Sequence, residues 1–483
     1  MFIPQPPVIA KERIIPAPSL EMTVKELTET LSEKGIDTNP HALVDKRTDG
    51  VEKEAHIMKI VTEQESLVNE KGDCKTDAMD IVISNATVSI RYGIIGLGQA
   101  GGKIADAFAD CNIPGKLKQK YPAFAVNTSK ADLDALNVIH QHHRIELPNS
   151  HLGAMRQPEV GYKAIMQGGA MDRVLKVCDE IFVNVDQVIV AAGIGGGTGT
   201  GTIQAVCEAL IEKGYSVIPL ITLPRDLDSL EEKKNAVNFL NMFQELIVSS
   251  MIAAPIIVDN NLLYNHYMKN APWDTDWKKD SNLQIVKAIN EMNAASGIAS
   301  PTTLDGAELL KLQRSGGCST IGKVVIPVDL NSDFNNEEIL ETLKDELNDA
   351  MHNGLLCDYP QLNEARAAGV QVLLPRTMSF GVAMEQAIDT VITESMPTLI
   401  SKFVGYVPVD DLEEIRVYTL ISGLGLPERA SNLSKAVTKE VEYLTQADSQ
   451  RTLFQANDVV IRNPFSKKGK KQVSNPFSKI EAR

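Results

Sequence analysis

Glycine and threonine alone fill residues 195–201 of this chain. An apolar run at residues 188–191 precedes the segment, and a helical pattern of apolar side chains follows it and ends at Gly214. Such a turn between a buried strand and a helix is typical of phosphate-binding sites, because glycines let backbone N–H groups approach phosphate oxygens and the helix dipole favours negative charge. We therefore predict phosphate contacts from Gly195, Gly196, Gly197, Thr198, Gly199, Thr200 and Gly201.

A second glycine-rich turn lies earlier in the chain. Gly96, Gly98 and Gly101 fit the GxGxxG spacing of dinucleotide-binding turns, so an NAD-dependent oxidoreductase of the Rossmann type is one alternative. That interpretation also needs an acidic residue at the end of the second strand to hold the ribose hydroxyls, and here the strand ends in Asn127 and Thr128. The turn is not a Walker A loop either, because an apolar residue stands where that loop has its magnesium-binding Ser or Thr.

The order of the apolar runs predicts the fold class. Short apolar runs alternate with helical patterns from residue 89 onward, which is typical of βα units around a mainly parallel sheet. Polar or glycine-rich residues follow each run, so the loops at the carboxyl ends of the strands should form the functional site. The strands we predict are residues 92–95, 124–126, 188–191, 216–221 and 255–258, and in a second set residues 324–328, 370–374 and 415–421.

The two glycine-rich turns, in this order, resemble the tubulin/FtsZ superfamily of GTPases, and most closely its plasmid- and phage-borne TubZ-type branch. Residues 152–161 are similar to the family loop that senses the γ-phosphate, and residues 222–226 to the TubZ-type loop near the ribose. Residues 258–264 resemble the start of the central helix that reads guanine, and residues 417–427 the last strand and turn before the terminal helix. The resemblance covers about residues 92–455 and implies GTP or GDP and Mg²⁺ as cofactors.

The resemblance also implies nucleotide contacts beyond residues 195–201. Asn260 and Asn261 stand at a helix start, where either amide could read the base edge or cap the helix. Asp226, Glu231 or Glu232 could contact the ribose. The further residues assigned to nucleotide binding are Gly98, Gln99, Ala100, Gly101, Gly102, Asn127, Gly153, Ala154, Arg156, Asp226, Asn260 and Asn261.

Catalytic carboxylates in this family lie in a loop after the central helix and reach the nucleotide of the next subunit. The matching stretch here contains Asp305 and Glu308, the second of which stands where the family pattern usually has Asp. A carboxylate pair at this spacing faces one side of a helix start, where it can polarise water or bind magnesium. Capping of the helix is the alternative function, because acidic residues are common in a first helical turn.

These observations predict an α/β protein with a mainly parallel Rossmann-like GTPase domain, a long central helix, a smaller α+β domain, a terminal helix and a basic tail. The helical region after residue 261 is interrupted by residues 273–277. The predicted parts are an N-terminal extension of unknown role (1–86), the GTP-binding domain (87–260), the central helix (261–298), the C-terminal α+β domain with the catalytic loop at its start (299–427), the terminal helix (428–456) and the flexible basic tail (457–483).

Charge and composition restrict the partners. The net charge of −15 argues against general nucleic-acid binding by the folded body. The basic tail is different, because residues 463–467 recur as residues 475–479 with an aromatic and a basic side chain in each copy. Such a tail suits a docking peptide for a DNA-binding adaptor, with direct contact to DNA or a membrane surface, or a merely solvated end, as alternatives.

The expected location is the cytoplasm. No apolar run approaches the roughly 20 residues needed to span a bilayer, and the six cysteines have no CxxC spacing, which favours reduced thiols. The leading interpretation is a GTPase that polymerises head-to-tail into filaments and segregates or positions plasmid or phage DNA. A filament protein that binds nucleotide without hydrolysing it is the second interpretation, and the oxidoreductase is the third.

Overall fold

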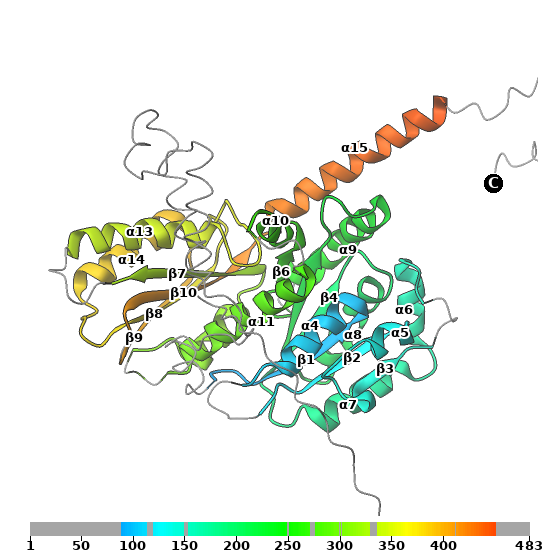
Figure 1. Ribbon diagram of the computed structural model, residues 1–483, viewed down its shortest axis with the longest axis horizontal. Helices are drawn as coiled ribbons and strands as arrows, with labels where there is room; N and C mark the ends of the chain where they lie inside the picture. The colour runs from blue at the N-terminus through cyan, green and yellow to red at the C-terminus, as the bar shows by residue number, and fades with distance from the viewer. Residues whose placement is uncertain are drawn as a thin grey trace, which may run out of the picture. The chain divides into compact units, whose positions relative to one another are not determined.

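The computed structural model describes residues 88–113, 119–148, 153–248, 251–270, 276–298, 300, 302–328, 336–410 and 412–450 (Figure 1). These residues form a ten-stranded, mostly parallel sheet and twelve α-helices, so the predicted fold class is confirmed. The predicted N-terminal extension and basic tail lie outside the described residues. No helix in the described part of the chain is long and apolar enough to cross a membrane.

Seven strands form the parallel part of the sheet, in the order β3-β2-β1-β4-β5-β6-β7. They are β1 (Tyr92–Leu97), β2 (Ala123–Asn127), β3 (Arg144–Glu146), β4 (Gln187–Gly193), β5 (Val217–Leu223), β6 (Ile256–Asp259) and β7 (Cys318–Pro327). Strands β1, β2 and β5 are buried over their whole length, as expected where helices cover both faces of a parallel sheet.

The C-terminal strands continue the same sheet as β7-β10-β8-β9, and a single register pair, Ile256 with Ser319, joins β6 to β7. Strand β10 is antiparallel to β7 and β8, whereas β8 and β9 are parallel. These strands are β8 (Ala367–Pro375), β9 (Ser401–Val409) and β10 (Glu414–Leu424). Strands β3 and β9 were not predicted, because β3 has only three residues and β9 is a half-exposed edge strand that contains Gly405 and Pro408.

Alternate residues of the strands point into two cores. Ile95 and Val190 face one core, and their neighbours Ile94 and Ile189 face the other. Helices that pack on the first face are α6 (Pro158–Met166), α7 (Ala170–Ile181), α8 (Thr198–Glu212), α9 (Leu230–Val248), α13 (Asn336–His352) and α14 (Val382–Ser395). Helices that pack on the second face are α4 (Gly98–Asp110), α5 (Lys130–Asp134), α10 (Asn260–Asn270), α11 (Trp277–Ser296) and α12 (Gly306–Gln313).

The region predicted as the central helix contains two helices, α10 and α11, with Asp276 as the N-cap of the second. Helix α11 is the longer of the two, at 20 residues, and packs in the second core through side chains such as Ile285, Ile289 and Met292. Its first turns reach the carboxyl ends of the strands. Residues 260–264, which resembled the start of the central helix, therefore belong to a separate short helix.

The terminal helix α15 (Glu428–Gln450) is anchored at its start and extends away from the sheet (Figure 1). Ala430 and Leu433 are buried in the first core, whereas most side chains from residue 434 to residue 446 are exposed or half-exposed. Arg429 holds the first turn, because its guanidinium pairs with Asp226 at 2.6 Å and with Asp259 at 3.2 Å. Burial raises the pKa of Asp259, and the charge of Arg429 opposes that shift.

Candidate functional site

A cavity of about 770 Å³ lies at the carboxyl ends of β1, β2, β4 and β5. Leu97, Asn127, Gly193 and Thr222, at or near the ends of these strands, line it. The chain passes from β1 to β2 on one side and continues on the other side with β4, so the cavity lies where the strand order reverses. Ligands of open α/β sheets bind at such a switch point.

Most of the residues predicted to bind nucleotide line this cavity. Those that do are Gly98, Gln99, Ala100, Asn127, Gly153, Ala154, Arg156, Gly195, Gly196, Gly197, Thr198, Gly199 and Asn260. The others, Gly101, Gly102, Thr200, Gly201, Asp226 and Asn261, are not among the lining residues.

Two of the glycines outside the lining are required by packing. A Cβ on Gly101 would lie 2.0 Å from the carbonyl oxygen of Ala191, so glycine lets α4 approach β4. A Cβ on Gly201 would lie 2.0 Å from the carbonyl oxygen of Pro158, so glycine lets α8 approach α6. Their contribution to the site is thus to place the two helix starts rather than to line the cavity.

Asp226 contacts both Asn261 and the terminal helix. The backbone N–H of Asp226 donates to Oδ1 of Asn261 at 3.1 Å, and the carboxylate of Asp226 binds Arg429. Arg429 also donates to the carbonyl oxygen of Pro224, which lines the cavity. These contacts connect the loop beside the cavity to α15.

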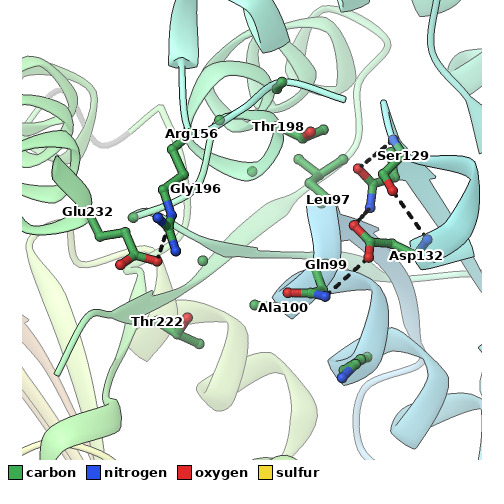
Figure 2. A pocket seen from close by; sticks show the side chains of 18 of the residues that line it. Leu97, Gln99, Ala100, Ser129, Asp132, Arg156, Gly196, Thr198, Thr222 and Glu232 are labelled. Carbon is green, nitrogen blue, oxygen red and sulfur yellow. Dashed lines mark hydrogen bonds and ion pairs between the residues drawn. The ribbon is translucent and has the colours of Figure 1, made fainter. Parts of the chain in front are cut away.

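Two helix starts without side-chain caps face the cavity. Helix α4 begins after Leu97 and helix α8 after Gly197, and neither N-cap side chain accepts a hydrogen bond from its helix. Their free N–H groups are available to an anion. The starts touch each other, because a Cβ on Gly98 (φ 69°) would lie 2.8 Å from the backbone N of Gly199. Apart from Gly196 and its chain neighbours, no heavy atom in the described part of the chain lies within 4 Å of the position a Cβ would take on Gly196, which is labelled in Figure 2. Phosphate groups fit between the start of α4 at Gly98 and the glycine-rich start of α8 at residues 195–199, which together are called the phosphate cradle below.

The loop at residues 153–156 forms another wall and has a strained backbone. Met155 (φ 46°) and Arg156 (φ 59°) have left-handed conformations that non-glycine residues seldom adopt. The Nε atom of Arg156 lies 3.2 Å from Oε1 of Glu232, as Figure 2 shows. The Arg156 side chain is 54% exposed, so it is able to exchange Glu232 for an anion in the cavity.

Hydrogen bonds fix the wall on the side of β2. Asp132 accepts from Nε2 of Gln99 at 3.1 Å (Figure 2) and from Nδ2 of Asn127 at 3.2 Å. The buried hydroxyls of Thr128 and Thr198 lie 2.7 Å apart and join the end of β2 to the start of α8. Sequence analysis did not assign Thr128 or Asp132 to the site, although Thr128 closely follows a predicted strand and Asp132 lies in the short helix after it.

The first turns of α11 supply a wall of different chemistry. Trp277, Ser281 and Asn282 line the cavity, and the hydroxyl of Ser281, which is 3% exposed, has no hydrogen-bond partner within the described residues. The guanidinium of Arg225 lies 4.8 Å from the centre of the Trp277 ring and 4.7 Å from that of Tyr264. Aromatic, amide and hydroxyl groups suit a heterocyclic base. The base-reading prediction named Asn260 and Asn261; Asn260 lines the cavity, and so does Asn282, which was not predicted.

The predicted catalytic pair does not line the cavity of its own chain. Asp305 is the N-cap of α12, and its Oδ1 accepts from the backbone N–H of Glu308 at 2.9 Å. The side chain of Glu308 accepts in return from the backbone N–H of Asp305 at 3.2 Å, which completes a capping box. The structure therefore gives both residues the capping function, and the Asp305 side chain is exposed at the surface.

Two carboxylates in the cavity wall, those of Asp228 and Glu232, are engaged with neighbours. Asp228 binds Arg225 at 2.7 Å, and Glu232 binds Arg156 and Ser229. Within the described ranges, no group of three or more His, Cys, Asp or Glu side chains is arranged to hold a metal ion. A magnesium ion bound here would take most of its ligands from phosphate and water, which is its usual preference.

Two family models match the chain. The GTPase domain of the tubulin/FtsZ family matches residues 91–268, and the C-terminal domain of TubZ-like tubulin/FtsZ-like proteins matches residues 291–434. The first match contains the whole glycine-rich cradle, and the second contains α12 and strands β7 to β10. These matches decide against the oxidoreductase alternative.

Individual relatives agree with these matches. The tubulin-like protein TubZ of Bacillus cereus is 26% identical over 393 residues, which covers 76% of this chain and 87% of that protein. The crystal structure of a GTPγS-form protofilament of TubZ from Bacillus thuringiensis serovar israelensis has a TM-score of 0.66 at 26% identity and covers 76% of this chain and 96% of its own. A helical model of a two-stranded TubZ-Bt filament has a TM-score of 0.67 at 25% identity, with 77% and 93% covered. The chain belongs to the tubulin/FtsZ family and combines its GTPase domain with a TubZ-like C-terminal domain.

Proposed function

We propose that this GTPase binds GTP in the cavity between β1 and β4 and polymerises head-to-tail into filaments. The observation that carries the proposal is the pair of uncapped, glycine-lined helix starts at the strand switch point, which form a cradle for phosphate. Filament and protofilament structures of the TubZ relatives support the assembly. A head-to-tail contact that does not close on itself produces a filament.

The nucleotide is oriented by the chemistry of the cavity walls. The phosphates lie at the glycine-rich starts of α4 and α8, with Arg156 beside them. The base lies at the start of α11, where Asn282 is able to donate to and accept from the edge of guanine. A magnesium ion held with the phosphates would balance their charge.

Hydrolysis requires a second subunit in this proposal. Asp305 and Glu308 are absent from the cavity of their own chain, and the Asp305 side chain is exposed, so it is available to a neighbouring molecule. The surface around the start of α12, which carries Asp305 and Glu308, is called the α12 face. When the α12 face of one subunit docks on the cavity of the next, the carboxylates would orient the attacking water.

The filaments would act on plasmid or phage DNA in the cytoplasm. The negative charge of the chain favours an indirect link, in which a DNA-binding adaptor docks on the repeated basic motif at residues 463–467 and 475–479. Those residues lie outside the described part of the chain.

Light scattering combined with phosphate release tests the proposal. Scattering should rise on addition of GTP with magnesium, and should not rise with ATP, with GDP, or with GTP in excess EDTA. Turnover per subunit should rise with protein concentration, because each active site is shared between two subunits. Equal assembly with ATP would contradict the base assignment, and turnover independent of protein concentration would contradict the shared site.

Asn282→Ala should weaken GTP binding about tenfold, because an amide that bonds the base contributes on the order of 1.5 kcal/mol. Asn261→Ala is the matched control, because Asn261 is not a lining residue. The affinity of this variant for GTP should stay within about twofold of wild type. Titration with a fluorescent GTP analogue measures both. If the Asn261 variant loses affinity and the Asn282 variant does not, the base is read from α10 instead.

A further inference from the structure

Asn235 joins two loops of the cavity without lining it. It stands in the second turn of α9, and its Nδ2 donates to the carbonyl oxygen of Arg156 at 2.7 Å and to that of Gly195 at 3.0 Å. One acceptor belongs to the strained loop at residues 153–156 and the other to the glycine-rich turn. A single amide group with two hydrogens therefore holds both loops.

The strained loop needs such a restraint. Met155 and Arg156 are both left-handed, and this backbone persists only where the surroundings hold it. The contact with the glycine-rich turn is close, because a Cβ on Gly197 would lie 2.7 Å from the Cβ of Ala154 and 2.8 Å from the backbone N of Gln157. A displacement of one loop therefore forces a displacement of the other.

The restraint is separate from the Arg156 side chain. The ion pair between Arg156 and Glu232 is half-exposed and able to break when an anion enters the cavity. The Asn235 hydrogen bonds go to backbone carbonyls and carry no net charge, so they persist when the ion pair opens. The backbone of the loop thus stays in place while the guanidinium turns.

We propose that Asn235 is a positioning residue that fixes loop 153–156 against the glycine-rich turn, so that the cavity distinguishes GTP from GDP. The proposal rests on the proposed function, because it places the γ-phosphate against these two loops. The α- and β-phosphates lie at the helix starts, which Asn235 does not contact. Loss of the amide should therefore affect GTP much more than GDP.

The test compares Asn235→Ala, Asn235→Asp and the control Asn238→Ala, which removes an exposed asparagine from the same helix. Mant-GTP affinity should fall about tenfold in Asn235→Ala, as expected for two lost hydrogen bonds, and mant-GDP affinity should stay within about twofold. Asn235→Asp should be at least as impaired, because a carboxylate has no N–H to donate and faces two carbonyl oxygens. Asn238→Ala should match wild type. A packing role predicts the opposite order, with the isosteric Asp variant better than Ala, and that order would overturn the proposal.

Trypsin gives a readout that needs no nucleotide. Cleavage after Arg156 in the nucleotide-free protein should be faster in both Asn235 variants than in wild type and Asn238→Ala, with circular dichroism and thermal melting to show that all four proteins are folded. Equal cleavage rates in wild type and Asn235→Ala would overturn this inference by itself. A wild type that binds neither mant nucleotide would instead overturn the proposed function, and the cleavage rates would still show whether Asn235 restrains the loop.

Discussion

Gly196→Val is expected to abolish GTP binding in a protein that remains folded. Apart from Gly196 and its chain neighbours, no heavy atom of the described residues lies within 4 Å of a Cβ at Gly196, so a side chain there has room in the protein and occupies the space in which a phosphate would lie. Gly196 lines the cavity beside the start of α8, and its backbone does not have the left-handed φ that would disfavour valine. Affinity for GTP should fall at least about a hundredfold, which corresponds to about 2.7 kcal/mol.

The adjacent glycine would give a less informative variant. A Cβ on Gly197 would lie 2.7 Å from the Cβ of Ala154 and 2.8 Å from the backbone N of Gln157, so valine there would displace loop 153–156 as well as block the ligand. A suitable control is Gly381→Val at the start of α14, because a Cβ at that position is also in open space and Gly381 is not a lining residue. The control should bind GTP normally. Normal affinity of a folded Gly196→Val protein, measured by calorimetry, would contradict the assignment of the phosphate cradle.

Local chemistry explains which parts of the site were predictable from the sequence. The glycine-rich turns could be predicted because their residues are neighbours in the sequence and form a pattern that is typical of phosphate-binding turns. Most of these residues line the cavity. Asn282 and Asn235 were not predicted, because only the packing of α11 and α9 brings the first to the cavity and the second to two of its loops. Gly101 and Gly201 were predicted to bind nucleotide but are required by helix packing. A sequence alone does not distinguish a glycine needed for packing from a glycine that faces a ligand.

The fold was predictable to a similar degree. Continuous apolar runs identified the buried strands, whereas the half-exposed strand β9 was missed. The predicted division into an α/β GTPase domain and a smaller α+β domain did not reveal that β6 and β7 join the two in one sheet. A single register pair between Ile256 and Ser319 leaves no local pattern in the sequence. The interruption of the predicted central helix at residues 273–277 was visible, but which of the two resulting helices reaches the cavity depends on packing.

Asp305 caps α12 and is also the proposed catalytic carboxylate. Asp305→Ala would remove both functions at once, and loss of the cap alone costs about 0.5–2 kcal/mol of stability. Asp305→Asn separates them, because asparagine caps a helix about as well as aspartate but carries no charge. Thermal stability should therefore fall in the alanine variant and stay near wild type in the asparagine variant.

Asp305→Asn should lower GTP turnover about 10²- to 10⁴-fold, as expected for loss of a positioned acid-base group, and leave GTP affinity and assembly intact. Filaments should then accumulate, because the nucleotide that drives assembly is not consumed. Phosphate release and sedimentation measure the two quantities. If the variant hydrolyses GTP at the wild-type rate, Asp305 is a helix cap only. If neither wild type nor variant releases phosphate while both assemble, the chain is a filament protein without turnover.

Mixing two inactive variants provides the decisive measurement of whether the active site is shared. Asp305→Asn has an intact cavity and lacks the carboxylate, whereas Gly196→Val lacks a usable cavity and retains Asp305 on an exposed surface. When the α12 face of a Gly196→Val subunit docks on the GTP-loaded cavity of an Asp305→Asn subunit, one complete site forms at that contact. Phosphate release by the mixture should exceed the sum of the two separate activities. The increase should be small, because a Gly196→Val subunit has no usable cavity for the next subunit and therefore ends the filament. A mixture no more active than that sum, with both proteins shown to co-sediment, would place the catalytic groups within the subunit that binds the nucleotide.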